Sequence, residues 1–196
     1  QDFEWKLYGH DTPDDLRQRL LAHGLEAEPP ESLLVLDLQD VPPRLLAPVD
    51  LDIRRIQDAR QLEDVGRIQE SVWGRVDPAH LAALGEEIRQ APDQQIIYVA
   101  YSERLPVAYG RLSFRDGTRF AGLWGGSTLE EYRGLGFYTA LLAVRLQEGL
   151  RRGARFLTID AGPMSRPIVE KFGFRFVTST QPFKWHATRP GGSSQA

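Results

Sequence analysis

The sequence predicts a mixed α/β fold organised around one mostly antiparallel sheet. Three apolar runs, residues 96–101, 107–114 and 120–129, follow one another as strands, and Asp116-Gly117 between the last two is a strong hairpin signal. A glycine-rich turn, an amphipathic helix and a short apolar strand at 156–159 come next, and this order favours a parallel pairing beside the third strand. We therefore expect helices on both faces of a sheet that contains one parallel pair.

Composition is that of a globular chain and excludes several functions. Of 196 residues, 41% are hydrophobic and 26% are charged, and the formal net charge is −3 with both signs interspersed. Neither a nucleic acid nor a membrane surface is therefore expected as a partner. The absence of cysteine excludes disulfides, thiolate metal ligands and a cysteine-bound acyl intermediate. Because the sequence shows no signal-like or membrane-spanning apolar run, we expect a cytoplasmic location.

Residues 1–48 are predicted to form a strand–helix–strand extension. Alternation over residues 3–8 indicates a strand. Pro13 suits the first position of a helix that Gly24 ends, and residues 33–38 suit a second strand.

The main domain is predicted to span residues 49–187, after a proline-rich connector. It opens with a strand at 51–56, and the spacing of apolar residues predicts helices at 59–72 and 78–90. The Gly- and Ser-rich residues 188–196 are expected to be a flexible tail.

The most informative segment is the turn within residues 130–142, EEYRGLGFYTALL, which follows a strand and opens a helix. A helix start leaves about four backbone N–H groups unpaired and carries roughly +0.5 of an elementary charge. Gly134 and Gly136 let a ligand approach the main chain closely, and Gly125-Gly126 in the preceding strand marks a bulge. The combination predicts a phosphate-binding site, yet it matches neither GxxxxGK[ST] nor a complete GxGxxG.

The C-terminal part of the domain is predicted to add a second helix and complete the sheet. Ser165 is expected to cap this helix and Gly173 to end it. Residues 174–178 and 182–187 are then expected to supply two closing strands.

Together these elements resemble the GNAT superfamily of N-acetyltransferases over residues 49–187. Two motifs carry the resemblance: the family signature of Arg or Gln, two residues, Gly, one residue and then Gly or Ala, and the run EKFGF at 170–174. Arg133, Gly136 and Tyr138 stand in the signature places, and Tyr138 departs from the small third residue. The resemblance implies a GNAT-type α/β fold whose parallel pair is splayed at a coenzyme cleft.

The resemblance also implies acetyl-CoA as co-substrate, lying where the strand that ends at Leu129 diverges from the strand 156–160. It implies that the pantetheine arm is held by the backbone of Ser127, Thr128 and Leu129. It implies that the pyrophosphate is held by the backbone amides of Arg133, Gly134, Leu135, Gly136, Phe137 and Tyr138. The side chain of Arg133 either adds a charge-assisted contact or forms a surface salt bridge with Glu130 or Glu131.

The catalytic groups follow less directly from the resemblance, because two positions that the family uses are changed. Where relatives often carry a tyrosine as proton donor and an asparagine, this chain has Val169 and Gly162. Asp160 ends a strand at the expected cleft, so it is either the catalytic proton acceptor or a cap for the next segment. Tyr138 and Ser165 are either proton donors to the leaving sulfur or, respectively, a packing residue and a helix cap.

Contacts to the acceptor substrate are expected from the connection between the two helices of residues 59–90 and from the third strand. Trp73 and Trp124 are the predicted substrate residues, with Asp77 and His80 near the first of them. The alternative is that Trp73 anchors the core and Asp77 caps a helix. The four histidines show no ligand spacing, so no metal is expected.

The N-terminal extension is similar to the end of the main domain. Residues 20–27, LLAHGLEA, loosely match residues 168–176, IVEKFGFRF. The extension is therefore either the remnant of a preceding GNAT-like half or an added unit that covers the sheet edge. A strand order that differed between residues 3–38 and 155–187 would end the duplication hypothesis.

From these residues we predict an enzyme that moves an acetyl group from acetyl-CoA to a primary amine of a small molecule or peptide. A catalytically reduced acyl-CoA-binding module is one alternative, favoured by Val169 and Gly162. A structural or partner-binding domain without a coenzyme is another. The sequence leaves a monomer and a homodimer both open.

Overall fold

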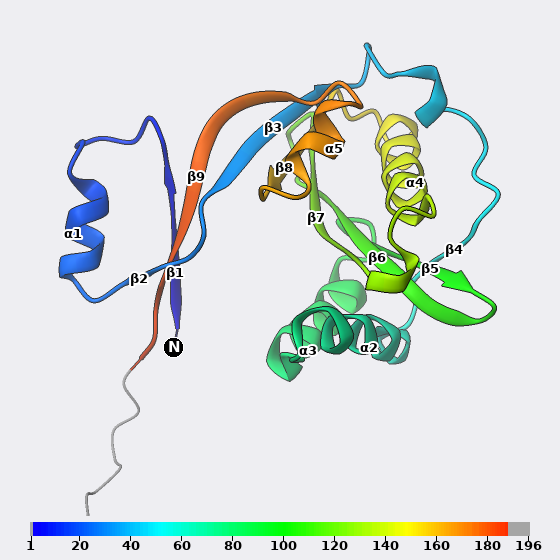
Figure 1. The fold of residues 1–196 in the computed structure, drawn as a ribbon, viewed down its shortest axis with the longest axis horizontal. Helices are drawn as coiled ribbons and strands as arrows, with labels where there is room; N and C mark the ends of the chain where they lie inside the picture. Colours follow the sequence, from blue (N-terminus) through cyan, green and yellow to red (C-terminus); the bar gives the residue numbers. More distant parts are fainter. Residues whose placement is uncertain (1, 188–196) are drawn as a thin grey trace, which may run out of the picture.

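The structure, a computed structural model, describes residues 2–187, and Figure 1 shows their arrangement. Within that range the strands form one sheet in the order β1-β9-β3-β8-β7-β6-β5-β4, with β2 paired to β9. The strands are β1 Phe3–Tyr8, β2 Glu26–Ala27, β3 Glu31–Asp37, β4 Asp52–Arg55, β5 Gln95–Ser102, β6 Leu105–Phe114, β7 Phe120–Thr128, β8 Phe156–Ala161 and β9 Arg175–Trp185. The α-helices are α1 Leu16–Ala22, α2 Leu62–Trp73, α3 Pro78–Gln90, α4 Phe137–Arg151 and α5 Arg166–Glu170. The tail predicted at 188–196 lies outside the described residues.

Strands β4 to β8 form the part of the sheet that positions the site. Neighbours from β4 to β7 pair antiparallel, and β7 pairs parallel with β8 from Phe120↔Phe156 to Leu123↔Ile159. The pairing is parallel because α4 carries the chain back along the sheet between these two strands. The predicted mixed α/β fold with one parallel pair is confirmed.

Both faces of this sheet are covered by helices, because alternation along the strands points apolar side chains to both. On β5, Ile96 belongs to a core cluster shared with α4, and its neighbour Ile97 belongs to a second cluster shared with α2 and α3. Figure 1 shows α2 and α3 together on one side of the strands and α4 on the other. Burying one such aliphatic side chain contributes roughly 1.5–3 kcal/mol, so the clusters fix where each helix lies.

Three predicted details of where elements begin or end are different in the structure. α1 begins at Leu16, after bends and turns that include Pro13, so this proline does not open the helix. Ser165 has helical backbone angles and makes no side-chain cap; its Oγ donates instead to the Gly162 carbonyl at 3.3 Å. The two predicted closing strands are one strand, β9, because β3 pairs with its first half and β1 with its second half.

The N-terminal extension is interleaved with the end of the main domain. β3 lies inside the sheet between β8 and β9, and β1 forms the edge beyond β9. Each unit therefore pairs its outer strand with the inner strand of the other unit: β1 pairs with β9, and β8 pairs with β3. Figure 1 shows β1 and α1, at the left, projecting from the main body along β9.

This exchange of strands has the form of an approximate two-fold repeat. Both units run strand, helix, left-handed glycine and strand, with Gly24 at φ +79° and Gly173 at φ +92°. Glu31 and Thr180, which follow these glycines at the same spacing, are register partners in the centre of the repeat. The two units thus have the same strand order, which is the condition set for the duplication hypothesis. That hypothesis, with the division into residues 1–48 and 49–187, stays a prediction.

Candidate coenzyme and acceptor site

A bulge in β7 opens the sheet at the centre of the candidate site. The β6–β7 register shifts between Trp124 and Ser127, where Gly125 and Gly126 have φ of +65° and +107°. Residues with a side chain seldom adopt such angles, so glycine is needed here. The parallel pairing with β8 stops at Leu123, immediately before the shift. β7 and β8 therefore diverge from this point, and the bulge predicted at the two glycines is present.

A buried arginine on α4, which no motif indicates, supports the neighbouring strand. Arg145 is 1% exposed, its Nε donates to the Leu141 carbonyl at 2.8 Å, and one terminal nitrogen donates to the Arg111 carbonyl of β6 at 3.2 Å. A Cβ on Gly110 would lie 2.7 Å from the guanidinium carbon, so this strand residue must be glycine. Burial lowers the pKa of Arg145 to about 10, which keeps the side chain charged at neutral pH.

The turn that follows β7 presents free backbone donors at the start of α4. Gly134 and Gly136 have φ of +77° and +90°, and a Cβ on either would meet no atom within 4 Å. Among residues 2–187, no hydrogen-bond acceptor lies in place for the N–H groups of Gly134, Leu135 and Gly136. The N–H groups of the first helical turn add further free donors. The turn is thus open and positively polarised, as an anion site requires.

The side chain of Arg133 lies against the free edge of β7. Its Nε donates to the Thr128 carbonyl at 3.3 Å. Within the described part of the chain it forms no ion pair with Glu130 or Glu131, so the salt-bridge alternative is not formed. The guanidinium therefore remains beside the turn as a second positive group.

A cavity of about 470 Å³, here called the coenzyme cavity, joins the turn to the bulge. Of the predicted coenzyme residues it brings together Ser127, Thr128, Arg133, Gly134, Gly136 and Tyr138. Leu129 and Phe137 are instead buried in the core, and Leu135 is exposed outside the lining. Met164, Ser165 and Ile168 close the cavity from the side of α5.

Only alternate residues of β7 direct backbone groups into this cavity. Leu129 donates its N–H to the Val107 carbonyl at 2.9 Å, and Ser127 is paired with β6 in the same way. By alternation, the backbone groups of Thr128 face away from β6. The Oγ of Ser127 accepts a hydrogen bond from Trp73 Nε1 at 3.2 Å. Of the backbone groups at 127–129 predicted to hold the pantetheine arm, only those of Thr128 therefore face the cavity rather than β6. The adjacent bulge is the other stretch of open backbone.

Both hydroxyl residues predicted as candidate proton donors, Tyr138 and Ser165, line the coenzyme cavity, whereas Val169, at the position the family uses, does not. Val169 is fully buried in the core, whereas Tyr138 and Ser165 line the cavity. The Tyr138 ring packs against the bulge, where a Cβ on Gly126 would lie 3.6 Å from it. Burial raises the pKa of Tyr138, so its hydroxyl stays protonated at neutral pH. Tyr138 is thus a packing residue that also presents a proton donor.

Asp160 lies one residue beyond the last β7–β8 pair, on the sheet face opposite α4. Its Oδ2 is 2.6 Å from Lys6 Nζ, and its Oδ1 accepts a hydrogen bond from Thr180 Oγ1 at 3.1 Å. Neither bond goes to the segment after β8, so the alternative role of Asp160 as a cap for that segment is wrong. No sequence pattern indicated Lys6, because only the interleaved sheet brings β1 to this position.

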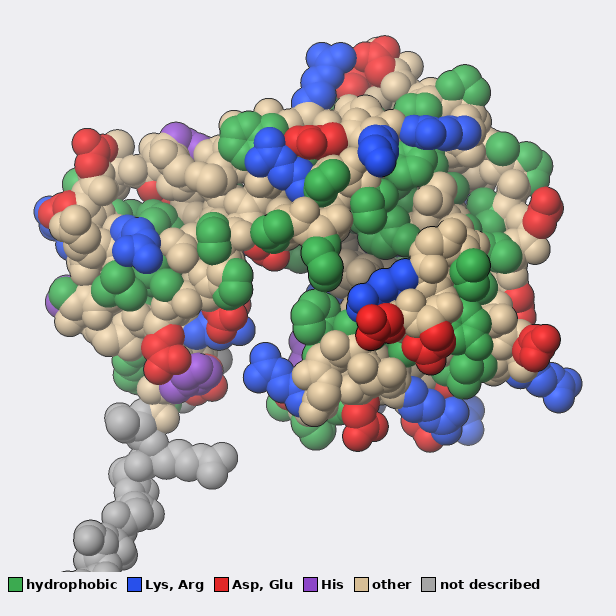
Figure 2. Space-filling view, viewed as in Figure 1, with side chains coloured by type: hydrophobic (Ala, Val, Ile, Leu, Met, Phe, Trp, Pro, Cys, Tyr) green, Lys and Arg blue, Asp and Glu red, His purple; other side chains and the backbone are tan. Residues whose placement is uncertain are grey.

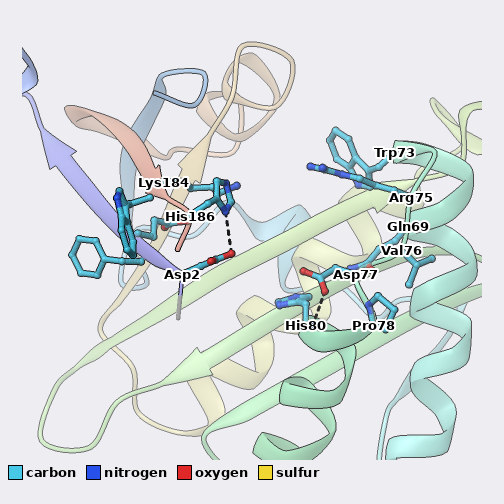
Figure 3. A pocket seen from close by; sticks show the side chains of 13 residues that line it. Asp2, Gln69, Trp73, Arg75, Val76, Asp77, Pro78, His80, Lys184 and His186 are labelled. Carbon is cyan, nitrogen blue, oxygen red and sulfur yellow. Dashed lines mark hydrogen bonds and ion pairs between the residues drawn. The ribbon is translucent and has the colours of Figure 1, made fainter. Parts of the chain in front are cut away.

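A second cavity, of about 770 Å³, lies on this opposite face and is here called the acceptor cavity (Figure 3). One wall is the α2–α3 connection with Arg75, Asp77 and His80, and the other is formed by the ends of β1 and β9. Figure 2 shows the cavity region as a deep notch between the projecting unit and the main body. Trp73 is 62% exposed and lines both cavities, so it stands where they meet rather than anchoring the core.

The predicted substrate residues are separated in the structure. Asp77 caps α3 by accepting hydrogen bonds from the N–H groups of Ala79 and His80, as its alternative role required. Trp124 lines neither cavity; its Nε1 donates to Ser113 Oγ at 2.8 Å and its ring centre is 5.5 Å from Lys6 Nζ. Trp73 therefore lies at the junction of the two cavities, whereas Trp124 lies outside both, with its ring beneath the Lys6 ammonium.

Comparison with solved structures shows the fold of N-acetyltransferases. A GCN5-related N-acetyltransferase from Kribbella flavida is 16% identical, with a TM-score of 0.64 over 96% of this chain and 68% of that one. A tandem GNAT protein from the clavulanic acid biosynthesis pathway is 15% identical, with a TM-score of 0.63 over 97% of this chain and 65% of that one. The aminoglycoside N-acetyltransferase AAC(6')-Iy in complex with CoA is 26% identical, with a TM-score of 0.54 over 66% of this chain and 90% of that one.

A family model described as the Acetyltransferase (GNAT) family matches residues 62–174. The chain therefore belongs to the GNAT family, and the predicted resemblance is confirmed. No curated protein gives a significant sequence match. Among residues 2–187 we find no helix with the length and apolarity needed to cross a membrane, and the cytoplasmic location stays a prediction.

Proposed function

We propose that this protein transfers an acetyl group from acetyl-CoA to a primary amine of a small molecule or peptide. The observation that carries the proposal is the row of free backbone N–H groups at Gly134, Leu135 and Gly136, at the mouth of a cavity that follows the free edge of β7. A pyrophosphate supplies the negative charge that this turn lacks. Membership of the GNAT family and the CoA complex of the AAC(6')-Iy relative support the same assignment.

Binding of the coenzyme is tested by thermal unfolding with acetyl-CoA. At a ligand concentration about 100 times the dissociation constant, binding adds roughly 2.7 kcal/mol to the free energy of unfolding. For a domain of this size each kcal/mol raises the melting temperature by about 2–4 °C, so we expect a rise of about 5–10 °C. An unchanged melting temperature would favour the structural domain without a coenzyme.

In the proposed reaction the amine nitrogen attacks the thioester carbonyl, the new C–N bond forms, and the C–S bond breaks. The amine loses a proton and the leaving thiolate gains one, so the chain has to handle two proton transfers. We assign the first to Asp160, whose carboxylate lies at the divergence of β7 and β8. We assign the second to Tyr138, which lines the coenzyme cavity and keeps its proton at neutral pH.

The role of Tyr138 predicts a selective effect of Tyr138→Phe. The ring still packs against Gly126, so the affinity for acetyl-CoA should change less than about threefold, while kcat should fall about 10- to 100-fold. Because burial raises the pKa of Tyr138 above the usual tyrosine value, the wild-type protein should lose no activity through deprotonation of this hydroxyl at neutral or mildly alkaline pH. An unchanged kcat would transfer the proton-donor role to Ser165 or to water, and Ser165→Ala separates these two.

The alternative is an acyl-CoA-binding module with reduced catalysis. It is favoured by Val169, a buried residue without a hydroxyl where relatives often carry a tyrosine, and by Gly162, which leaves empty the space that the asparagine side chain of relatives would fill. Turnover separates the two functions. Release of free thiol from acetyl-CoA is readable without background from the protein, because the chain contains no cysteine. A thermal shift without thiol release for any amine would support the binding module.

A further inference from the structure

Several charged groups of the acceptor cavity already have hydrogen-bond or ion-pair partners. Asp2 Oδ2 is 3.0 Å from His186 Nδ1, and Lys184 Nζ is 3.1 Å from Glu28 Oε1. Asp77 is engaged by the first amides of α3. These groups shape the walls but leave no strong preference for a charged ligand.

Two lining residues, Glu4 and Arg75, have no hydrogen bond or ion pair to any side chain between residues 2 and 187. They lie on opposite walls: Glu4 on β1, and Arg75 on the α2–α3 connection, where Figure 3 shows its side chain extending into the cavity beside Trp73. His80 on the same wall is half-buried; burial, and next the charge of Arg111 on β6, lower its pKa, so His80 adds no lasting positive charge at neutral pH. Within the described residues the cavity therefore has an unpaired carboxylate, Glu4, on the β1 wall beside the ion-paired Lys184, and an unpaired guanidinium, Arg75, on the opposite wall.

The acidic wall continues along β1 to Asp160 of β8. Glu4 and Lys6 point to the same face of β1, and Lys6 holds Asp160. Glu31 is half-buried among these three side chains, and burial is the main cause that raises its pKa. The cluster thus places several carboxyl groups around Lys6, and Glu4 is the member of the cluster that lines the acceptor cavity.

We propose that the acceptor is a zwitterion: an amine that also carries a carboxylate, as in an amino acid or a short peptide with a free C-terminus. Its ammonium lies on the β1 side, attracted by Glu4, which is two residues along the strand from the lysine that contacts Asp160, and its carboxylate pairs with Arg75. A guanidinium suits a carboxylate because it donates two parallel hydrogen bonds. A cavity of about 770 Å³ has room for such a molecule. This inference rests on the proposed function, because it names the acceptor of the same transfer.

The test compares acceptors that differ in one charge. Thiol release is measured with the common amino acids and a set of dipeptides, each beside its own carboxamide. We expect kcat/KM to be roughly 10- to 100-fold higher for the carboxylate form, the effect of one charge-assisted contact. Arg75→Gln should lower the value for the carboxylate to that for the carboxamide and leave the carboxamide unchanged, whereas Arg75→Lys should restore part of the difference.

The matched control is Arg60→Gln, which removes an exposed arginine whose partner is Asp58, outside the acceptor cavity. It should leave both acceptor forms unaffected. Equal kcat/KM for carboxylates and carboxamides overturns the inference and leaves the transfer activity standing. If no acceptor releases thiol, calorimetric titration of the same pairs into the CoA-loaded protein decides: a preference for the carboxylate that Arg75→Gln removes keeps the zwitterion site, and no binding of either form overturns it.

Discussion

Gly136→Asp is expected to abolish coenzyme binding, with a loss of affinity of at least about 100-fold, because it sets a carboxylate against the pyrophosphate. Gly136 is the N-cap of α4, its φ is +90°, and a Cβ there would meet nothing within 4 Å. Aspartate tolerates the left-handed region better than most residues and is favourable at a helix start, so the fold should persist. Calorimetric titration with CoA, beside a thermal unfolding curve, measures both quantities.

The control for this substitution is Gly153→Asp, at the other end of α4. Gly153 also has a positive φ, +78°, and open space around its Cβ position, so the same backbone strain arises without a phosphate nearby. It should lower the melting temperature at least as much as Gly136→Asp, because a negative charge is unfavourable near a helix C-terminus. Its affinity for CoA should be that of the wild type. Retained affinity in Gly136→Asp would place the pyrophosphate elsewhere.

Asp160→Asn is the second substitution with a large expected effect. If the carboxylate takes the amine proton, kcat should fall roughly 10²- to 10⁴-fold with little change in the affinity for acetyl-CoA. The amide keeps an oxygen that can accept from Thr180 Oγ1, so the strand contact survives. Each carboxylate oxygen accepts one hydrogen bond, from Lys6 or from Thr180, so a lone pair remains on each for the proton of the acceptor amine or of a water.

Lys6→Met separates catalysis from the ion pair. Both substitutions break the contact between Lys6 and Asp160, whose side chains are 21% and 13% exposed, so both should lower the melting temperature. Only Asp160→Asn removes the proton acceptor, and only it should lose turnover by orders of magnitude. Equal losses of turnover in the two variants would make the pair structural and remove Asp160 from the mechanism.

The features predicted most closely from the sequence are those that depend on neighbouring residues. The turn at Arg133 to Gly136 follows from glycines placed between a strand and an amphipathic helix, and the structure shows left-handed angles at both glycines. The hairpin at Asp116-Gly117 and the bulge at Gly125 are local in the same sense. The single parallel pair follows from chain order, because a helix between two neighbouring strands returns the chain in the same direction.

What could not be predicted depends on partners that are distant in sequence. Alternation identifies residues 31–37 as a strand, but nothing local states that the strand enters between β8 and β9. The contact between Lys6 and Asp160 follows from that insertion alone. Arg145 was missed for a related reason: its carbonyl partner lies on β6, and the space for its guanidinium comes from the missing side chain of Gly110. The side-chain cap predicted at Ser165 is wrong because residue type alone does not set the backbone angles: Ser165 is helical, and its Oγ donates to the Gly162 carbonyl.

We propose that the main-chain donors from Gly134 to Tyr138 hold the diphosphate of the coenzyme. Hydrogen–deuterium exchange of these amides with and without CoA measures it most directly, since exchange reports hydrogen bonding residue by residue. We expect exchange from Gly134 to Tyr138 to slow at least about tenfold when CoA binds, with no change at the β1 edge. Saturating CoA that leaves these amides unprotected while protecting another segment would contradict the account.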